Sequence, residues 1–118
     1  MAIVNALASV AVRNLTASMR WYERLFGRAA DSRPMPEVAE WKFERGGWLQ
    51  VYQLSERAGM GSVTLAVGSL DEQIVTLRKL GIDPGAPSIN PQVTVVMIKD
   101  LDGNSIAFAE ARTGGLAQ

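Results

Sequence analysis

Aromatic and charged side chains that could bind a flat ligand gather in residues 40–53. Residues 40–45 and 48–53 alternate in character on either side of Gly46-Gly47, which predicts a β-hairpin with a two-residue turn. In that register six side chains share one face of the hairpin. They are Trp41, Phe43, Arg45, Trp48, Gln50 and Tyr52. Their rings could stack on a flat ligand, and Arg45 could pair with an anionic group.

The same register has two further consequences for the hairpin. Trp41 lies opposite Tyr52, and Lys42 and Glu44 lie on the other face with Leu49 and Val51. An aromatic cluster on a sheet face is also a common form of core or of dimer interface. Ligand binding and plain packing therefore both remain open.

Carboxylates offer weaker candidates for chemistry. Asp100 and Asp102 form a pair in sequence, but with Gly103 and Asn104 they predict a polar turn whose side chains bond their own backbone. Glu37, Glu40 and Glu44 are expected to be solvated. No carboxylate is clearly placed on the aromatic face, which disfavours acid–base catalysis there.

Two residue types that carry much of enzyme chemistry are missing. The chain has no histidine and no cysteine, which excludes a Ser-His-Asp triad, thiolate nucleophiles and metal sites built on imidazole or thiolate. Twelve basic and twelve acidic residues cancel, so nucleic acid is an unexpected partner. No apolar run is long enough to span a bilayer, and residues 1–5 do not resemble a signal peptide, so a cytoplasmic location is expected.

A repeated pattern supplies the elements that would position these residues. A strand over 3–12 leads through Asn14 into a helix over 15–26 that ends at Gly27. A strand over 62–67 leads through Ser69 into a second helix that ends at Gly81. Val12 and Val67 are as far apart in sequence as Leu25 and Leu80. Each half therefore predicts strand–helix–strand–strand–strand, an α+β fold with modules over about 1–55 and 61–112.

This twice-used βαβββ unit resembles the vicinal oxygen chelate (VOC) superfamily, which includes glyoxalase I, bleomycin resistance proteins, fosfomycin resistance proteins and extradiol dioxygenases. The most specific matches are residues 12–15 before the first helix, residues 21–27 at its end, and residues 100–104 before the last strand. The resemblance covers almost the whole chain and implies one domain over 1–118 with two cupped mixed sheets.

The resemblance also implies where a metal would be held. Metal-dependent members place a histidine on the first strand of each half and a carboxylate near its end. Those positions fall on Leu7, Gln50, Ser62 and Ala107, none of which is a charged ligand. Glu110 is three residues past Ala107 and is expected on the opposite face of its strand. No metal and no cofactor are therefore expected.

Strand parity extends the candidate binding face to the first strand of each half. Ser9 shares a face with Leu7, and Thr64 shares a face with Ser62. Ser9, Ser62 and Thr64 could hydrogen-bond a ligand or could simply fill space. The neighbouring positions on the other face are apolar and are expected to meet the helices.

Three functions follow as hypotheses. The first is a metal-independent small-molecule binding protein of the bleomycin resistance type, which sequesters a flat aromatic antibiotic or metabolite in a dimer-interface cup and has no catalytic residue. The second is an enzyme, lyase or dioxygenase-like, that works without histidine. The third is a structural or regulatory dimer that binds no ligand. A homodimer is expected in all three cases.

Overall fold

The computed structural model describes residues 2–112, which form two compact units. Unit 1 comprises residues 2–61 together with the turn at 100–104, and unit 2 comprises residues 62–99 and 105–112. The single domain expected over 1–118 extends beyond the described residues at both ends. Neither helix of the described part is long and apolar enough to cross a membrane.

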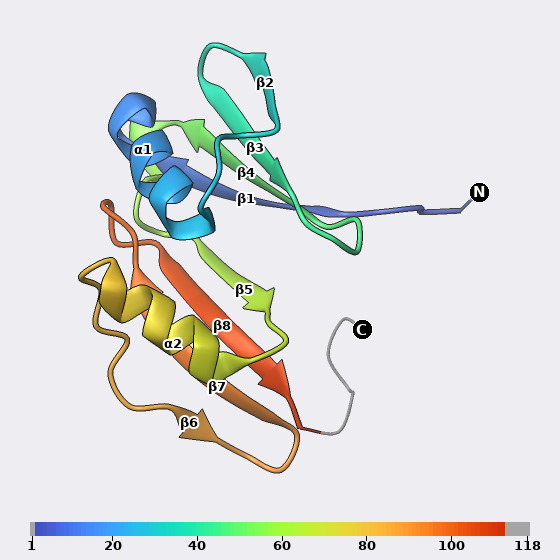
Figure 1. Cartoon of the computed structure of the whole chain (residues 1–118). Helices are drawn as coiled ribbons and strands as arrows, with labels where there is room; N and C mark the ends of the chain where they lie inside the picture. The colour runs from blue at the N-terminus through green and yellow to red at the C-terminus, as the bar shows by residue number, and fades with distance from the viewer. Residues whose placement is uncertain (1, 113–118) are drawn as a thin grey trace. The chain divides into compact units, whose positions relative to one another are not determined.

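Unit 1 is a four-stranded mixed sheet with one helix on it (Figure 1). Its elements are β1 (Leu7–Val12), α1 (Leu15–Phe26), β2 (Ser32–Met35), β3 (Val38–Lys42), β4 (Trp48–Gln53) and a 3₁₀ turn (Ser55–Arg57). The strand order is β1-β4-β3-β2, in which β1 runs parallel to β4 and the other pairs are antiparallel.

Unit 2 repeats this arrangement with its own sheet and helix. Its elements are β5 (Ser62–Ala66), α2 (Leu70–Lys79), β6 (Ser88–Ile89), β7 (Val93–Lys99) and β8 (Ser105–Ala111). The strand order is β5-β8-β7-β6, again with one parallel pair, β5 and β8. The predicted α+β fold, with strand–helix–strand–strand–strand in each half, is confirmed.

The helices begin and end where the local chemistry requires. Asn14 Oδ1 accepts a hydrogen bond from Ala17 N at 3.1 Å and caps α1. Gly27 ends it in the left-handed region at φ 71°, which a residue without a Cβ adopts without strain. Ser69 Oγ accepts from Glu72 N at 3.2 Å at the start of α2. All three caps were predicted from the sequence.

The core of unit 1 lies between α1 and one face of its sheet. Tyr22 and Trp41 are its largest fully buried side chains, and their ring centroids lie 6.0 Å apart. Val10, Leu49 and Val51 come from β1 and β4 and are 0–1% exposed. Burial of side chains of this size stabilises the fold by roughly 1.5–3 kcal/mol each.

The Asp100–Asn104 turn adds a buried polar network to unit 1. Asp100 Oδ1 accepts from the backbone N–H groups of Asp102 and Asn104, both at 2.9 Å, as the sequence predicts for a self-capped turn. Asn104 then bonds the carbonyl of Ala11 and the N–H of Gly61, both at 2.8 Å. The turn is thereby bound to β1 and to the chain just before β5.

A tyrosine completes this network. The Tyr22 hydroxyl donates to Asp100 Oδ2 at 2.7 Å. Burial of the ring, followed by the negative charge of Asp100, raises the pKa of the Tyr22 phenol far above its usual range. The phenol therefore stays protonated and remains a donor to the buried carboxylate.

We expect Tyr22→Phe to lower the free energy of unfolding by about 1–3 kcal/mol, because the buried Asp100 carboxylate loses a donor that nothing replaces. Urea denaturation followed by circular dichroism measures this. Tyr52→Phe is the matched control, since its hydroxyl is not part of this network, and it should change stability by less than about 0.5 kcal/mol. Equal effects of the two substitutions would contradict the role given to the Tyr22 hydroxyl.

Candidate functional site

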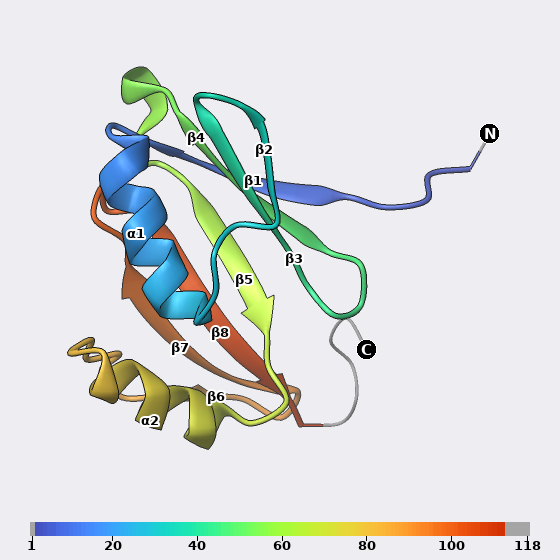
Figure 2. The same cartoon turned by 45° about the horizontal axis from the view of Figure 1, so that its top comes forward.

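The loop between β3 and β4, which can be followed in Figure 2, is not the predicted two-residue turn. Gly46 N donates to the Phe43 carbonyl at 3.0 Å, and Phe43 N donates to the Gly47 carbonyl at 2.8 Å. Gly46 has φ 96°, whereas Gly47 does not have positive φ. These features define a three-residue loop, Glu44–Gly46, in which the first glycine takes the left-handed position.

This loop changes the register of the hairpin, so the predicted register is wrong. Trp41 lies opposite Leu49, Glu40 opposite Gln50, and Lys42 opposite Trp48. The partner of each β3 residue is displaced by an odd number of positions, which exchanges the two faces of β3. Lys42 thus lies on the face of Trp48 and not, as predicted, on the face of Leu49 and Val51.

Three predicted site residues consequently leave the aromatic face. Trp41 is 0% exposed, packs against Phe26 of α1 at a centroid distance of 5.6 Å, and donates its indole N–H to the Arg28 carbonyl at 3.1 Å. Phe43 also contacts Phe26, at 5.3 Å. Arg45 is exposed in the hairpin loop. Trp41 and Phe43 therefore belong to the α1 side of the sheet.

The face of the unit 1 sheet that α1 does not cover is called here the open face. The register of β1, β4 and β3 places Ser9 beside Gln50 and Ala11 beside Tyr52, as strand parity predicts. The residues of the open face are Leu7, Ser9, Ala11, Val38, Glu40, Lys42, Trp48, Gln50 and Tyr52. Four of the predicted ligand-binding residues, Ser9, Trp48, Gln50 and Tyr52, are thus together on one surface.

A row of hydrogen-bonded polar side chains crosses the middle of the open face. Ser9 Oγ donates to Gln50 Oε1 at 3.3 Å, and Gln50 Nε2 donates to Glu40 Oε2 at 2.9 Å. Glu40 and Gln50 are both partly buried. A reversed Gln50 amide would set its oxygen against the Glu40 carboxylate, so the carboxylate fixes the direction of the row.

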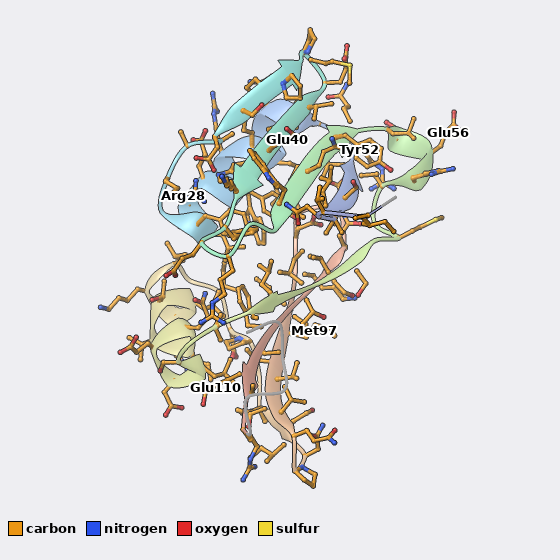
Figure 3. All side chains as sticks on the ribbon, turned by 90° about the vertical axis from the view of Figure 1, so that its right-hand side faces the viewer. Arg28, Glu40, Tyr52, Glu56, Met97 and Glu110 are labelled. Atoms are coloured by element: carbon orange, nitrogen blue, oxygen red, sulfur yellow. The ribbon has the colours of Figure 1, made fainter. Side chains whose placement is uncertain are left out.

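Aromatic rings lie on both sides of this polar row. Trp48 and Tyr52 are two positions from Gln50 along β4, in opposite directions, and both are partly exposed. The ammonium of Lys42 lies 5.9 Å from the centroid of the Trp48 ring. Figure 3 labels Glu40 and Tyr52, which come from the neighbouring strands β3 and β4. The open face thus offers two flat apolar surfaces separated by hydrogen-bonding groups.

The remaining predicted residues, Ser62 and Thr64, lie in unit 2. Both are exposed on the face of β5 that shares its register with Ser105 and Ala107 of β8. On the same face Lys99 Nζ of β7 donates to Ser105 Oγ at 2.7 Å. The same face also carries the apolar Val95 and Met97 of β7, and among the described residues it carries no aromatic ring.

The four positions at which related proteins would hold a metal do not fit one here. Leu7 and Ala107 have no ligand atom in their side chains, and the amide of Gln50 is already bonded to Ser9 and Glu40. Glu110 lies on the α2 side, as predicted, and accepts a hydrogen bond from Leu70 N at 2.6 Å. Within residues 2–112, no three acidic side chains gather into a group that could hold a metal ion.

The open face is exposed only in part, since Ala11 and Val38 on it are buried and Trp48, Gln50 and Tyr52 are partly exposed. Two shallow grooves of the described residues lie elsewhere, one along Asp71, Val75 and Lys79 and the other along Arg20 and Arg24. Neither groove includes a residue of the open face.

Comparison with known proteins identifies the family. A glyoxalase / bleomycin resistance protein from Catenulispora acidiphila DSM 44928 has 31% sequence identity with this chain and superposes with a TM-score of 0.81, covering 92% of this chain and 98% of that one. The chain belongs to the glyoxalase / bleomycin resistance protein family. The resemblance inferred from the βαβββ repeat is confirmed.

Two further proteins share the fold at lower sequence identity, so their similarity to this chain shows the fold alone. TnmS3, an antibiotic binding protein from Streptomyces sp. CB03234, has 21% identity and a TM-score of 0.80 over 94% of this chain and 98% of its own. The bleomycin resistance determinant encoded on the transposon Tn5 has 18% identity and a TM-score of 0.77 over 93% of this chain and 99% of its own. No protein-family model and no curated protein matches the sequence.

Sequence reasoning missed Glu40 and Lys42 because it chose the wrong loop. A Gly-Gly pair fits a two-residue turn, but its first glycine also fits the left-handed position that ends a three-residue loop. One signal favoured the second choice. With the three-residue loop, Trp41 joins Leu49 and Val51 in one apolar face, so the large side chains of both strands meet the helix.

We expect Gly46→Ala to lower the free energy of unfolding by about 1–2 kcal/mol, because a Cβ is unfavourable at φ 96°. Gly47→Ala is the matched control, since nothing lies within 4 Å of an added Cβ there. It should change stability by less than about 0.5 kcal/mol. Urea denaturation distinguishes the two loops, because a type I′ turn at Gly46-Gly47 would make both substitutions costly.

Proposed function

We propose that this chain binds a flat aromatic small molecule on the open face of unit 1 and releases it chemically unchanged, without a metal. One observation carries the proposal. Trp48 and Tyr52 present partly exposed rings on the uncovered face, on either side of the Ser9–Gln50–Glu40 row. Stacking on a well-placed ring contributes roughly 0.5–1.5 kcal/mol beyond the burial of area, and the polar row orients the ligand.

Two observations support binding over catalysis: the kinds of protein that share the fold, and the lack of charged side chains at the four positions implied for a metal. Two proteins of the same fold are an antibiotic binding protein and a bleomycin resistance determinant. Leu7, Gln50, Ser62 and Ala107 offer no charged ligand to a cation. Sequestration needs no catalytic group, only surfaces that contact the ligand, and the rings of Trp48 and Tyr52 and the polar row between them are such surfaces.

Calorimetric titration tests this function with metal-free bleomycin and a panel of other flat aromatic antibiotics. We expect saturable binding of at least one compound, and a loss of about tenfold or more in affinity for Trp48→Ala, because a stacked ring and its buried area are removed. Trp21→Ala, on α1, is the control and should bind as the unsubstituted protein does.

Three results would contradict the proposal. Absence of binding across the panel would favour a structural or regulatory role. Chemical conversion of any compound by metal-stripped protein would favour an enzyme. Trp48→Ala binding as tightly as the unsubstituted protein would place the ligand elsewhere.

We further propose that two copies of the chain associate and that the second copy covers the ligand. The apolar Leu7 of the open face is 49% exposed, beside the partly exposed Trp48 on β4. A symmetric dimer would bury such residues and give two equivalent sites.

Sedimentation velocity measures the state of association at the concentrations used for binding. We expect a single species with twice the mass of one chain, and Leu7→Glu should convert it to the single-chain species, because a carboxylate would have to be buried. Val75→Glu is the control, since Val75 is 50% exposed on the surface of α2. A single-chain species that still binds ligand would contradict the covering role of a second copy.

A further inference from the structure

The corrected hairpin register reverses the charge that the open face presents to a ligand. The predicted register placed Arg45 there, which would select an anion. The structure places the Glu40 carboxylate at the centre of the face, opposite Gln50, and leaves Arg45 in the exposed loop. The group that selects the ligand is thus negatively charged.

The Glu40 carboxylate is held in place but is not neutralised. Its Oε2 atom accepts from Gln50 Nε2 at 2.9 Å, and Gln50 is held in turn by Ser9. The ion pairs of Arg13 with Asp102 and of Arg28 with Asp31 do not involve Glu40. Within residues 2–112, Oε1 of Glu40 accepts no hydrogen bond, so it is left for a donor from outside.

The nearest cation on the face is engaged elsewhere. Lys42 is two positions from Glu40 on β3, and its ammonium lies over the Trp48 ring, 5.9 Å from the centroid. A negative ring face attracts a cation, so this ammonium already occupies a place that suits a positively charged ligand group. An incoming cation would displace the flexible lysine at small cost, because Lys42 is exposed.

We infer that the ligand of the open face is a flat aromatic cation, whose positively charged N–H group donates to Glu40 while its rings contact Trp48 and Tyr52. This inference rests on the proposed function and adds the class of ligand to it. A hydrogen bond between charged groups is stronger and more directional than one between neutral groups. Glu40 therefore determines specificity, and Trp48 and Tyr52 supply contact area.

Three flat three-ring probes that differ mainly in charge test the inference. They are 9-aminoacridinium (positive), acridine (neutral) and anthracene-9-carboxylate (negative), each titrated calorimetrically at neutral pH into the full chain. We expect 9-aminoacridinium to bind about tenfold more tightly than acridine, as for a charged hydrogen bond on a partly exposed surface. Anthracene-9-carboxylate should bind most weakly.

Substitutions on β3 and in its loop assign this preference to a residue. Glu40→Gln should bring the affinity for 9-aminoacridinium to that for acridine and leave the acridine affinity unchanged. Glu44→Gln is the matched control, because it removes the same charge from the exposed loop. Lys42→Gln should strengthen binding of 9-aminoacridinium by removing a competing cation.

A measurement on the unsubstituted protein keeps the test valid if Glu40→Gln fails to fold. Added sodium chloride should weaken the binding of 9-aminoacridinium and leave acridine binding unchanged, because salt screens only the charged pair. Equal affinities for the three probes, or tighter binding of the anion, would overturn the inference while the proposed function stands. Absence of binding by all three would overturn the inference, and absence of binding across the antibiotic panel as well would overturn the proposed function.

Discussion

The hydrogen bonds that close the loop between β3 and β4 determine which side chains lie on the open face and which form the core. Gly46 adopts a left-handed conformation, and the Phe43–Gly47 pair then fixes every partner along the two strands. A displacement by an odd number of residues would expose Trp41 and bury Glu40 under α1. Burial of an indole is favourable and burial of an unpaired carboxylate is not, so packing and loop geometry select the same register.

A second constraint holds the scaffold behind this face. Asp100 and Asn104 come late in the chain but pack in unit 1, where they bond Tyr22, Ala11 and Gly61. A buried carboxylate is tolerated because four donors surround it, from Tyr22, from the backbone of Asp102, and from the backbone and side chain of Asn104. The network fixes the end of β1 and thereby the strand that carries Ser9.

Much of the fold could be predicted from local sequence signals, because those signals act within a few residues. Asn14, Gly27 and Ser69 cap the helices as expected, and strand parity placed Ser9 and Ser62 correctly. The composition of the site could not be predicted in full. Gly46-Gly47 is compatible with two loops, and only the packing of Trp41 on α1 distinguishes them. The hydrogen bond between Tyr22 and Asp100 joins residues far apart in sequence, and no local pattern predicts it.

The central claim is that a flat aromatic ligand lies on the open face between Trp48 and Tyr52. Intermolecular nuclear Overhauser effects between 9-aminoacridine and isotopically labelled protein test it most directly. The account predicts contacts from the acridine ring protons to the side chains of Trp48 and Tyr52, and none to Trp41. Contacts confined to the helices, or contacts to Trp41 in a folded protein, would contradict both the binding face and the register that creates it.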